Sequence, residues 1–388
     1  MFHVTLISVL VLAGLFSSLP AQAVSQVAAA ERYFRQGVEL QRKGDLNGAR
    51  QAYLSALQLA PDRPDVNANL GLVYLRLGEY DQAVKRYAAA LRSLPTHEGL
   101  RLQLGLAYLQ AQQFDLAQHE LTTVLKANPR HHQARQALGM ALLRTNRLQE
   151  GIKELEKVYA SQPGNFDVLY TLGSAYIRVG RLRDVAPLIN GPFKQLDTPQ
   201  AALIEGSYEL AKRNYLAALA KLRRAQRLNP KLPGLQSELG YAYVLTGNRK
   251  LAIEMFEGEL QINPADFNAN AFLGWLYREN GHLDQATVLL NNALRLRPDD
   301  GGVIFQLAQV SQVRGSLDET AQLLEKAVTL NPDFTPAHVL LARTYFKQKR
   351  FKDAERERGI IERLNAEEQE RQPSNPDLRY TGITVPLN

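Results

Sequence analysis

Apolar residues recur along most of the chain with the spacing of amphipathic helices, and each helical stretch ends at a turn residue or a proline. Residues 70–95 read LGLVYLRLGEYDQAVKRYAAALRSLP, and 34 positions later the chain reads LGLAYLQAQQFDLAQHELTTVLKANP. In the first segment Gly78 separates two helical stretches, and Pro95 ends the second. The pattern predicts pairs of helices joined by a short turn and repeated every 34 residues.

Small residues and prolines keep the 34-residue step over most of the sequence. The prolines are Pro61, Pro95, Pro129 and Pro163, then Pro230, Pro264, Pro298 and Pro332. The small residues on the first helices are Gly37, Gly71, Gly105, Gly139, Gly173, Gly206, Gly240, Gly274, Ala308 and Ala342. Without bulk there, the two helices of a pair can approach closely, and a larger side chain would overpack them by about 1–3 kcal/mol.

A residue that tolerates the left-handed backbone conformation stands between the two helices of most pairs. These residues are Gly44, Gly78, Asn146, Gly180, Gly247, Gly281 and Gly315. We expect each of them to end a first helix, so that the chain can reverse within a few residues.

Together with frequent aromatics three residues after the glycine, such as Tyr74 and Tyr108, these features resemble the tetratricopeptide repeat over residues 30–365. The resemblance implies an all-α, right-handed superhelical solenoid of about ten helix-turn-helix units. One pair cannot cover its own apolar face, whereas stacked pairs cover one another.

The repeat is irregular at residues 187–198. Pro187 lies inside the expected second helix of the fifth unit, and Gly191-Pro192 should end that helix early. Thr198-Pro199 then reads as an N-cap and first-turn proline of the sixth unit. The irregularity is interpreted either as a tolerated deletion or as a hinge between units one to five (30–198) and units six to ten (199–365).

The first 23 residues differ from the rest, since they contain no Lys, Arg, Asp or Glu and include an apolar run from Val4 to Phe16 before AQA at 21–23. They predict a signal peptide cleaved after Ala23, with an uncleaved anchor as the alternative. A short linker at 24–29 would follow. We therefore expect an exported protein of the bacterial periplasm or cell envelope. At the other end, residues 366–388 would form a helix end and a disordered tail.

Composition excludes several kinds of site. The chain has no cysteine, so it forms no disulfide or thiolate site. It shows no phosphate loop, nucleophile elbow or metalloprotease helix motif. His131 and His132 lie in a turn, and Asp115 with His119 supplies only two ligands, so no metal, cofactor or catalytic residue is expected. Export and the modest net charge of +7 disfavour a nucleic-acid partner.

One face of the first helices is apolar and would line a concave groove in arrays resembling this one. Its members lie one residue after the small residue, and four before and three after that position. The candidate groove residues are Phe34, Val38, Leu72, Leu102, Leu106, Met140, Tyr170, Tyr241, Trp275 and Phe305. Either they are exposed and hold a protein or peptide partner, or several are buried between successive units.

A second candidate surface is basic. Residues 199–232 contain Lys212, Arg213, Lys221, Arg223, Arg224 and Arg227 against few acids. They form either a solvated outer face or a docking patch for an anionic polymer, polysaccharide or membrane surface. The sequence predicts a non-catalytic interaction scaffold, and it does not specify the partner or the oligomeric state.

Overall fold

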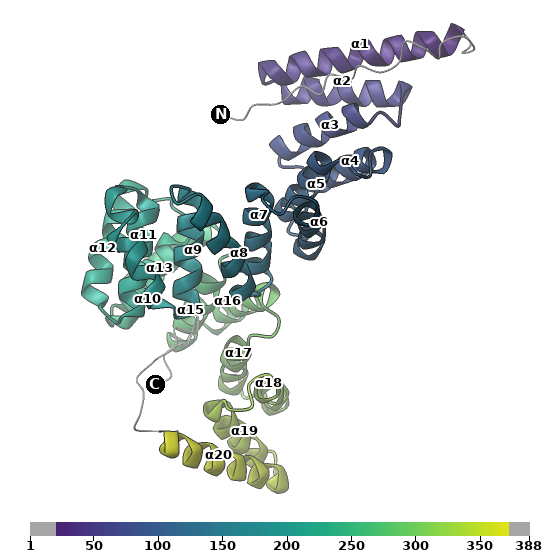
Figure 1. Cartoon of the computed structure of the whole chain (residues 1–388). Coiled ribbons are helices and arrows are strands. Elements are labelled where there is room, and N and C mark those ends of the chain that lie inside the picture. Colours follow the sequence, from purple (N-terminus) through teal and green to yellow (C-terminus); the bar gives the residue numbers. More distant parts are fainter. Residues whose placement is uncertain (1–20, 372–388) are drawn as a thin grey trace. The chain divides into compact units, whose positions relative to one another are not determined.

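The computed structural model describes residues 21–371, and these residues form α-helices and one short 3₁₀ helix, with no strand among them (Figure 1). The expected all-α fold is therefore confirmed. Residues 1–20, which hold most of the predicted signal peptide, and residues 372–388 of the predicted tail lie outside the described residues. Among residues 21–371, no helix combines the length and the apolar character needed to cross a membrane.

The helices alternate between the first and second members of successive pairs. The first helices are α1 (Ala21–Lys43), α3 (Pro64–Arg76), α5 (Glu98–Gln110), α7 (His132–Arg144), α9 (Phe166–Arg178), α11 (Pro199–Ala211), α13 (Leu235–Leu245), α15 (Phe267–Glu279), α17 (Gly301–Val313) and α19 (Thr335–Lys347). The second helices are α2 (Leu46–Leu59), α4 (Tyr80–Ser93), α6 (Phe114–Ala127), α8 (Leu148–Ser161), α10 (Leu182–Asn190), α12 (Tyr215–Leu228), α14 (Arg249–Ile262), α16 (Leu283–Leu296), α18 (Leu317–Leu330) and α20 (Phe351–Arg371).

The turns within the pairs have the predicted backbone. Each predicted turn residue, from Gly44 with φ of 85° to Asn146 with φ of 62°, has a positive φ. The same conformation occurs at three residues that the sequence did not indicate, Gln112, Arg213 and Lys349, with φ of 58–63°. The turn is thus imposed by the packing of the two helices, and glycine merely adopts it at lower cost.

Within a pair, the two helices are in close contact where the small residue on the first helix packs against the side chain 16 positions later in the sequence. A Cβ atom added at Gly71 would lie 3.0 Å from the Tyr87 ring, and one at Gly139 would lie 2.7 Å from Leu155. Tyr87 and Leu155 are almost completely buried. The repeated glycines therefore make room for the largest core side chains.

The first turn of several first helices is fixed by a polar side chain that spans the pair. Arg101 donates to the carbonyl oxygen of Pro95 and to Glu120, both at 2.7 Å. Thirty-four residues later, Arg135 makes the same two bonds to Pro129 and Glu154. In the last pair His338 takes this place, with Nε2 2.9 Å from the Pro332 carbonyl and Nδ1 2.6 Å from Glu357.

The fifth pair has the expected short second helix. Helix α10 has 9 residues and ends at Asn190, whereas α8 and α12 have 14. The 3₁₀ helix η1 (Phe193–Gln195) follows and inserts Phe193, which is 1% exposed. A Cβ atom added at Gly173 would lie 3.5 Å from the Phe193 ring and 3.3 Å from Ile204. Phe193 thus fills the space that the residue 16 positions after the glycine fills in other pairs.

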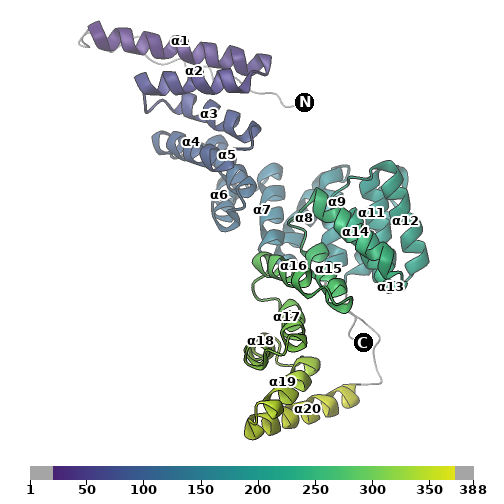
Figure 2. The ribbon, with the colours of Figure 1, turned by 180° about the vertical axis from the view of Figure 1, so that it is seen from behind.

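The chain divides into two compact units, Met1–Pro163 and Gly164–Asn388. In each unit the helices follow one another as pairs in chain order (Figures 1 and 2). The division precedes the irregular stretch at 187–198, which lies inside the second unit. That this stretch is a hinge stays a prediction.

Candidate functional site

The first helices of unit 1 carry a row of partly exposed apolar side chains. These are Phe34 and Val38 on α1, Leu72 on α3, Leu106 on α5 and Met140 on α7, and we call them the first-helix strip. Phe34, Val38 and Leu72 pack against the core cluster of Tyr53 to Leu104, and Leu106 packs against the next cluster. These four side chains are therefore anchored in the core on one side, and all five members of the strip leave part of their surface to solvent.

Three other candidate groove residues are buried, which corrects their assignment as free binding surface. Leu102, Trp275 and Phe305 are 5%, 6% and 3% exposed. Leu102 packs against alanines of α7 in the following pair. The Phe305 ring meets Phe334 edge-on at 5.0 Å, and Trp275 lies in the core cluster of α11–α15. Coverage by neighbouring pairs, which helical periodicity does not reveal, explains the difference.

The remaining two candidates, Tyr170 on α9 and Tyr241 on α13, are partly exposed and lie near a polar residue of unit 2. Tyr241 packs on Phe272 with ring centroids 5.2 Å apart. Glu238 of α13 is near enough to act electrostatically on both tyrosines, and its Oε2 accepts a hydrogen bond of 3.1 Å from the Ser207 hydroxyl of α11. Successive first helices of this unit, α9, α11 and α13, are in contact and bring these residues together.

Glu238 has an unusual electrostatic environment. Burial raises its pKa from 4.5 to about 7, the Ser207 hydrogen bond opposes this change, and the nearby Asp266 carboxylate adds to it. Burial, together with the charge of Glu238, also raises the pKa of Tyr170 and of Tyr241. Ser207 and Glu238 are not among the candidates predicted from the sequence, where the one indication is a lone acid in the apolar segment LQSELGYAYV.

Most of the basic patch is paired inside the structure. Lys221 lies 2.7 Å from Glu205, Arg224 lies 2.7 Å from Asp197, and Lys212 lies 3.3 Å from Glu209. Arg223 donates to the Tyr243 hydroxyl, while Arg213 forms the turn after α11. The three ion pairs offset part of the positive charge that a polyanion would contact, and they favour the solvated outer face.

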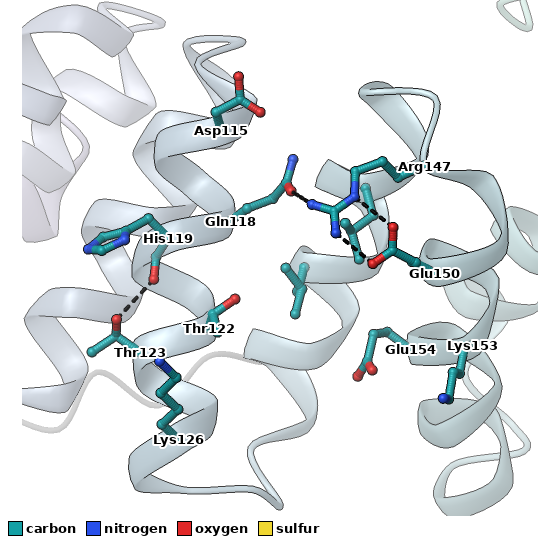
Figure 3. A pocket seen from close by; sticks show the side chains of 12 residues that line it. Asp115, Gln118, His119, Thr122, Thr123, Lys126, Arg147, Glu150, Lys153 and Glu154 are labelled. Carbon is teal, nitrogen blue, oxygen red and sulfur yellow. Dashed lines mark hydrogen bonds and ion pairs between the residues drawn. The ribbon is translucent and has the colours of Figure 1, made fainter.

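An open hollow of about 570 Å³ lies between α6 and α8 of unit 1, with Leu138 and Leu142 of α7 among its lining residues (Figure 3). The guanidinium of Arg147 bridges this hollow from Gln118, at 2.8 Å, to Glu150, at 2.7 Å. Asp115 and His119 both line the hollow, and within the described residues no hydrogen bond joins their side chains. The arrangement offers charge pairs and no nucleophile bonded to a base.

The two adjacent histidines at the start of α7, His131 and His132, contact neighbouring residues of the fold. His131 is the N-cap of α7 and accepts a hydrogen bond from the amide of Ala134 through Nδ1 at 3.3 Å. His132 lies 3.1 Å from the Ser161 hydroxyl. Over residues 21–371, no cluster of three or more His, Asp or Glu side chains has the arrangement of a metal site.

Family models for the tetratricopeptide repeat match most of the chain that carries these helix pairs. The matched residues are 39–78, 68–102, 102–166, 203–267, 267–300 and 314–380. The chain belongs to the tetratricopeptide repeat family. Such arrays generally act as scaffolds for protein–protein interaction, because stacked helix pairs present extended surfaces.

Solved structures with the same repeat fold match the array. The Cut9–Hcn1 hetero-tetramer of the APC/C is 12% identical, with 89% of this chain and 90% of that chain covered and a TM-score of 0.52. Two MamA structures are 18% and 17% identical, cover 42% and 46% of this chain and 96% and 98% of theirs, and have TM-scores of 0.39 and 0.40. A comparison with curated proteins gives no match.

Proposed function

We propose that this tetratricopeptide array is a non-catalytic scaffold or adaptor of the bacterial periplasm or cell envelope, and that it holds a protein or peptide partner along its first helices. The observation that carries the proposal is the first-helix strip. Its apolar side chains recur on successive first helices and remain partly exposed, although each helix already buries other residues in the core. Apolar side chains that recur on successive first helices suit a partner segment with matching apolar side chains.

The proposed location rests on the sequence of residues 1–23, with their uncharged apolar run and the AQA motif. Cleavage after Ala23 would leave almost all of α1 in place, because that helix continues to Lys43. Cell fractionation with N-terminal sequencing tests this proposal. We expect an exported chain that begins at Val24, and a cytoplasmic chain that retains Met1 would refute it.

Partner capture is tested with the double variant Leu72→Glu/Leu106→Glu. An apolar partner would have to bury the two carboxylates without an opposite charge, which should prevent binding. Because Leu72 and Leu106 are both partly exposed, the array should still fold with these substitutions. The control is Leu116→Glu on α6, where the native side chain is 49% exposed on a second helix. Each variant is compared with the native chain by in-cell crosslinking, pull-down and mass spectrometry.

We expect a protein that is recovered with the native chain and with Leu116→Glu but is lost with the double variant. Circular dichroism must show equal helix content in all three chains. If the double variant retains every partner, the first-helix strip is not the binding surface.

The alternative function, binding of an anionic polymer or membrane surface through the basic patch, predicts a different salt response. Exposed charge contacts weaken as ionic strength rises, whereas apolar contacts largely survive. We expect partner capture to persist in 0.5 M salt, where the Debye length is roughly 4 Å instead of about 10 Å at 0.1 M. Recovery of glycan or lipid that disappears at high salt would favour the patch instead.

A further inference from the structure

Glu238 is partly exposed, and it has fewer partners for its negative charge than the buried carboxyl groups Glu205 and Glu259 of the same unit. Glu205 is paired with Lys221 at 2.7 Å and with Arg224 at 3.7 Å. Glu259 accepts the backbone amides of Gly234 at 2.7 Å and Gln236 at 3.2 Å. Glu238, in contrast, receives only the Ser207 hydroxyl, and among residues 21–371 it has no ion pair.

This deficit is costly to the free protein, because a carboxylate removed from water needs an opposite charge or several hydrogen bonds. The Asp266 carboxylate increases the cost, since it repels a second negative charge nearby. The raised pKa of Glu238 reflects this cost of holding its ionised form in the folded protein. Carboxyl groups in such environments gather at functional sites more than elsewhere.

The surroundings of Glu238 suit a cation. Tyr170 and Tyr241 lie close enough to sense its charge, and both remain partly exposed on first helices. Aromatic faces and a carboxylate together attract an ammonium or guanidinium group, which a single carboxylate can then pair with directly. A metal ion would need more ligands than one carboxylate and neutral hydroxyls, and an anion would be repelled.

We propose that Glu238, with Ser207 and the tyrosines Tyr170 and Tyr241, is a recognition position for one Lys or Arg side chain of the protein partner. The proposal rests on the proposed function, since the cation arrives on a partner segment bound along the first helices α9, α11 and α13 of unit 2. Tyr170 and Tyr241 of the same unit then add apolar contact, and the charge pair selects partner segments with a basic residue at one register.

The test uses a random dodecapeptide library displayed on phage and selected on the intact protein and on two variants. Glu238→Gln keeps the shape and removes the charge. Glu254→Gln, at an exposed position on the second helix α14, makes the same chemical change away from the first helices. Hydrogen exchange locates each selected peptide on the array.

We expect peptides selected on the native chain and on Glu254→Gln to share Lys or Arg at one fixed position relative to their apolar residues. That preference should vanish on Glu238→Gln, while the apolar positions remain. Peptides with apolar positions only, or a basic preference that survives Glu238→Gln, would overturn the cation site and leave the scaffold function intact. Peptides that slow hydrogen exchange only in second helices, or a library from which no peptide is selected, would overturn both the cation site and the proposed binding along the first helices.

A second measurement uses one selected peptide and its analogue with norleucine in place of the basic residue. Glu238→Gln should weaken binding of the basic peptide at least tenfold and leave the norleucine analogue unchanged. At pH 7 the native chain should also release roughly half a proton when the basic peptide binds, because the cation ionises the carboxyl group. Calorimetry in buffers of different ionisation enthalpy measures that proton, and its absence would contradict the proposal.

Discussion

The Ser207 hydroxyl on α11 donates a hydrogen bond of 3.1 Å to Glu238 Oε2 on α13, and this bond joins the first helices of two successive pairs. Its donor and acceptor are 31 residues apart in the sequence. The bond holds a carboxyl group at a partly exposed position near Tyr170 and Tyr241, and little else compensates its charge. The stability of the free protein and its proposed selectivity for a partner therefore depend on the same residue.

Replacement of Glu238 by Gln should stabilise the free protein in a pH-dependent way. Because burial raises the pKa of Glu238 from 4.5 to about 7, the folded chain holds this proton more tightly than the unfolded chain. The resulting stability is complete below about pH 4.5 and is lost as the pH rises through about 7. Above that range the ionised carboxylate costs about 3 kcal/mol.

Urea unfolding at pH 4.5 and pH 8.5 measures this effect. We expect Glu238→Gln to match the native chain at the lower pH and to exceed its stability at the higher pH, with Glu254→Gln unchanged at both. If the difference in the free energy of unfolding between Glu238→Gln and the native chain is the same at both pH values, the folded protein does not disfavour the ionised carboxyl group.

Replacement of Gly139 by Ala should overpack the fourth pair. The added Cβ would lie 2.7 Å from Leu155 and 3.2 Å from the Gly151 carbonyl oxygen. We expect a loss of about 1–3 kcal/mol in the free energy of unfolding. The control is Gly359→Ala on α20, where the new Cβ would lie within 4 Å of no atom outside its own stretch of helix, and a gain of about 0.5–1 kcal/mol is expected there. Equal effects at the two sites would contradict the close packing of Gly139 against Leu155.

Replacement of Phe193 by Ala should open a cavity in the irregular fifth pair. Phe193 is 1% exposed and meets the Phe166 ring edge-on at 6.4 Å, so its loss should cost about 3–5 kcal/mol. Hydrogen exchange should show faster opening of α9, α10 and α11. Phe346→Ala, at a position that is 65% exposed, is the matched control and should have little effect. Unchanged exchange in α9–α11 would mean that Phe193 does not replace the missing turn of α10.

The repeat architecture could be predicted from the sequence because its determinants are local. The positive φ at Gly78 or Asn146 and the short helix before Gly191 follow from the residues at those positions. The same turn at Arg213 and Lys349 could not be predicted, because the flanking helices impose it on residues without that preference.

The candidate site was less predictable because it depends on how far one pair covers the next. The helical period places Leu72 and Leu102 on the same face, yet only Leu102 is buried by the following pair. In the same way, the meeting of Ser207 with Glu238 depends on the register between neighbouring first helices. No spacing within one helix encodes that register.

The central claim, that a partner lies along the first helices, is tested most directly by photo-methionine labelling in cells. The chain has three methionines, of which Met140 lies in the first-helix strip and Met255 lies on the second helix α14. After irradiation, mass spectrometry of the purified protein assigns each intermolecular adduct to one of these positions. We predict partner adducts at Met140 that disappear in the Leu72→Glu/Leu106→Glu variant. Partner adducts confined to Met255, or Met140 adducts unaffected by that variant, would contradict the account.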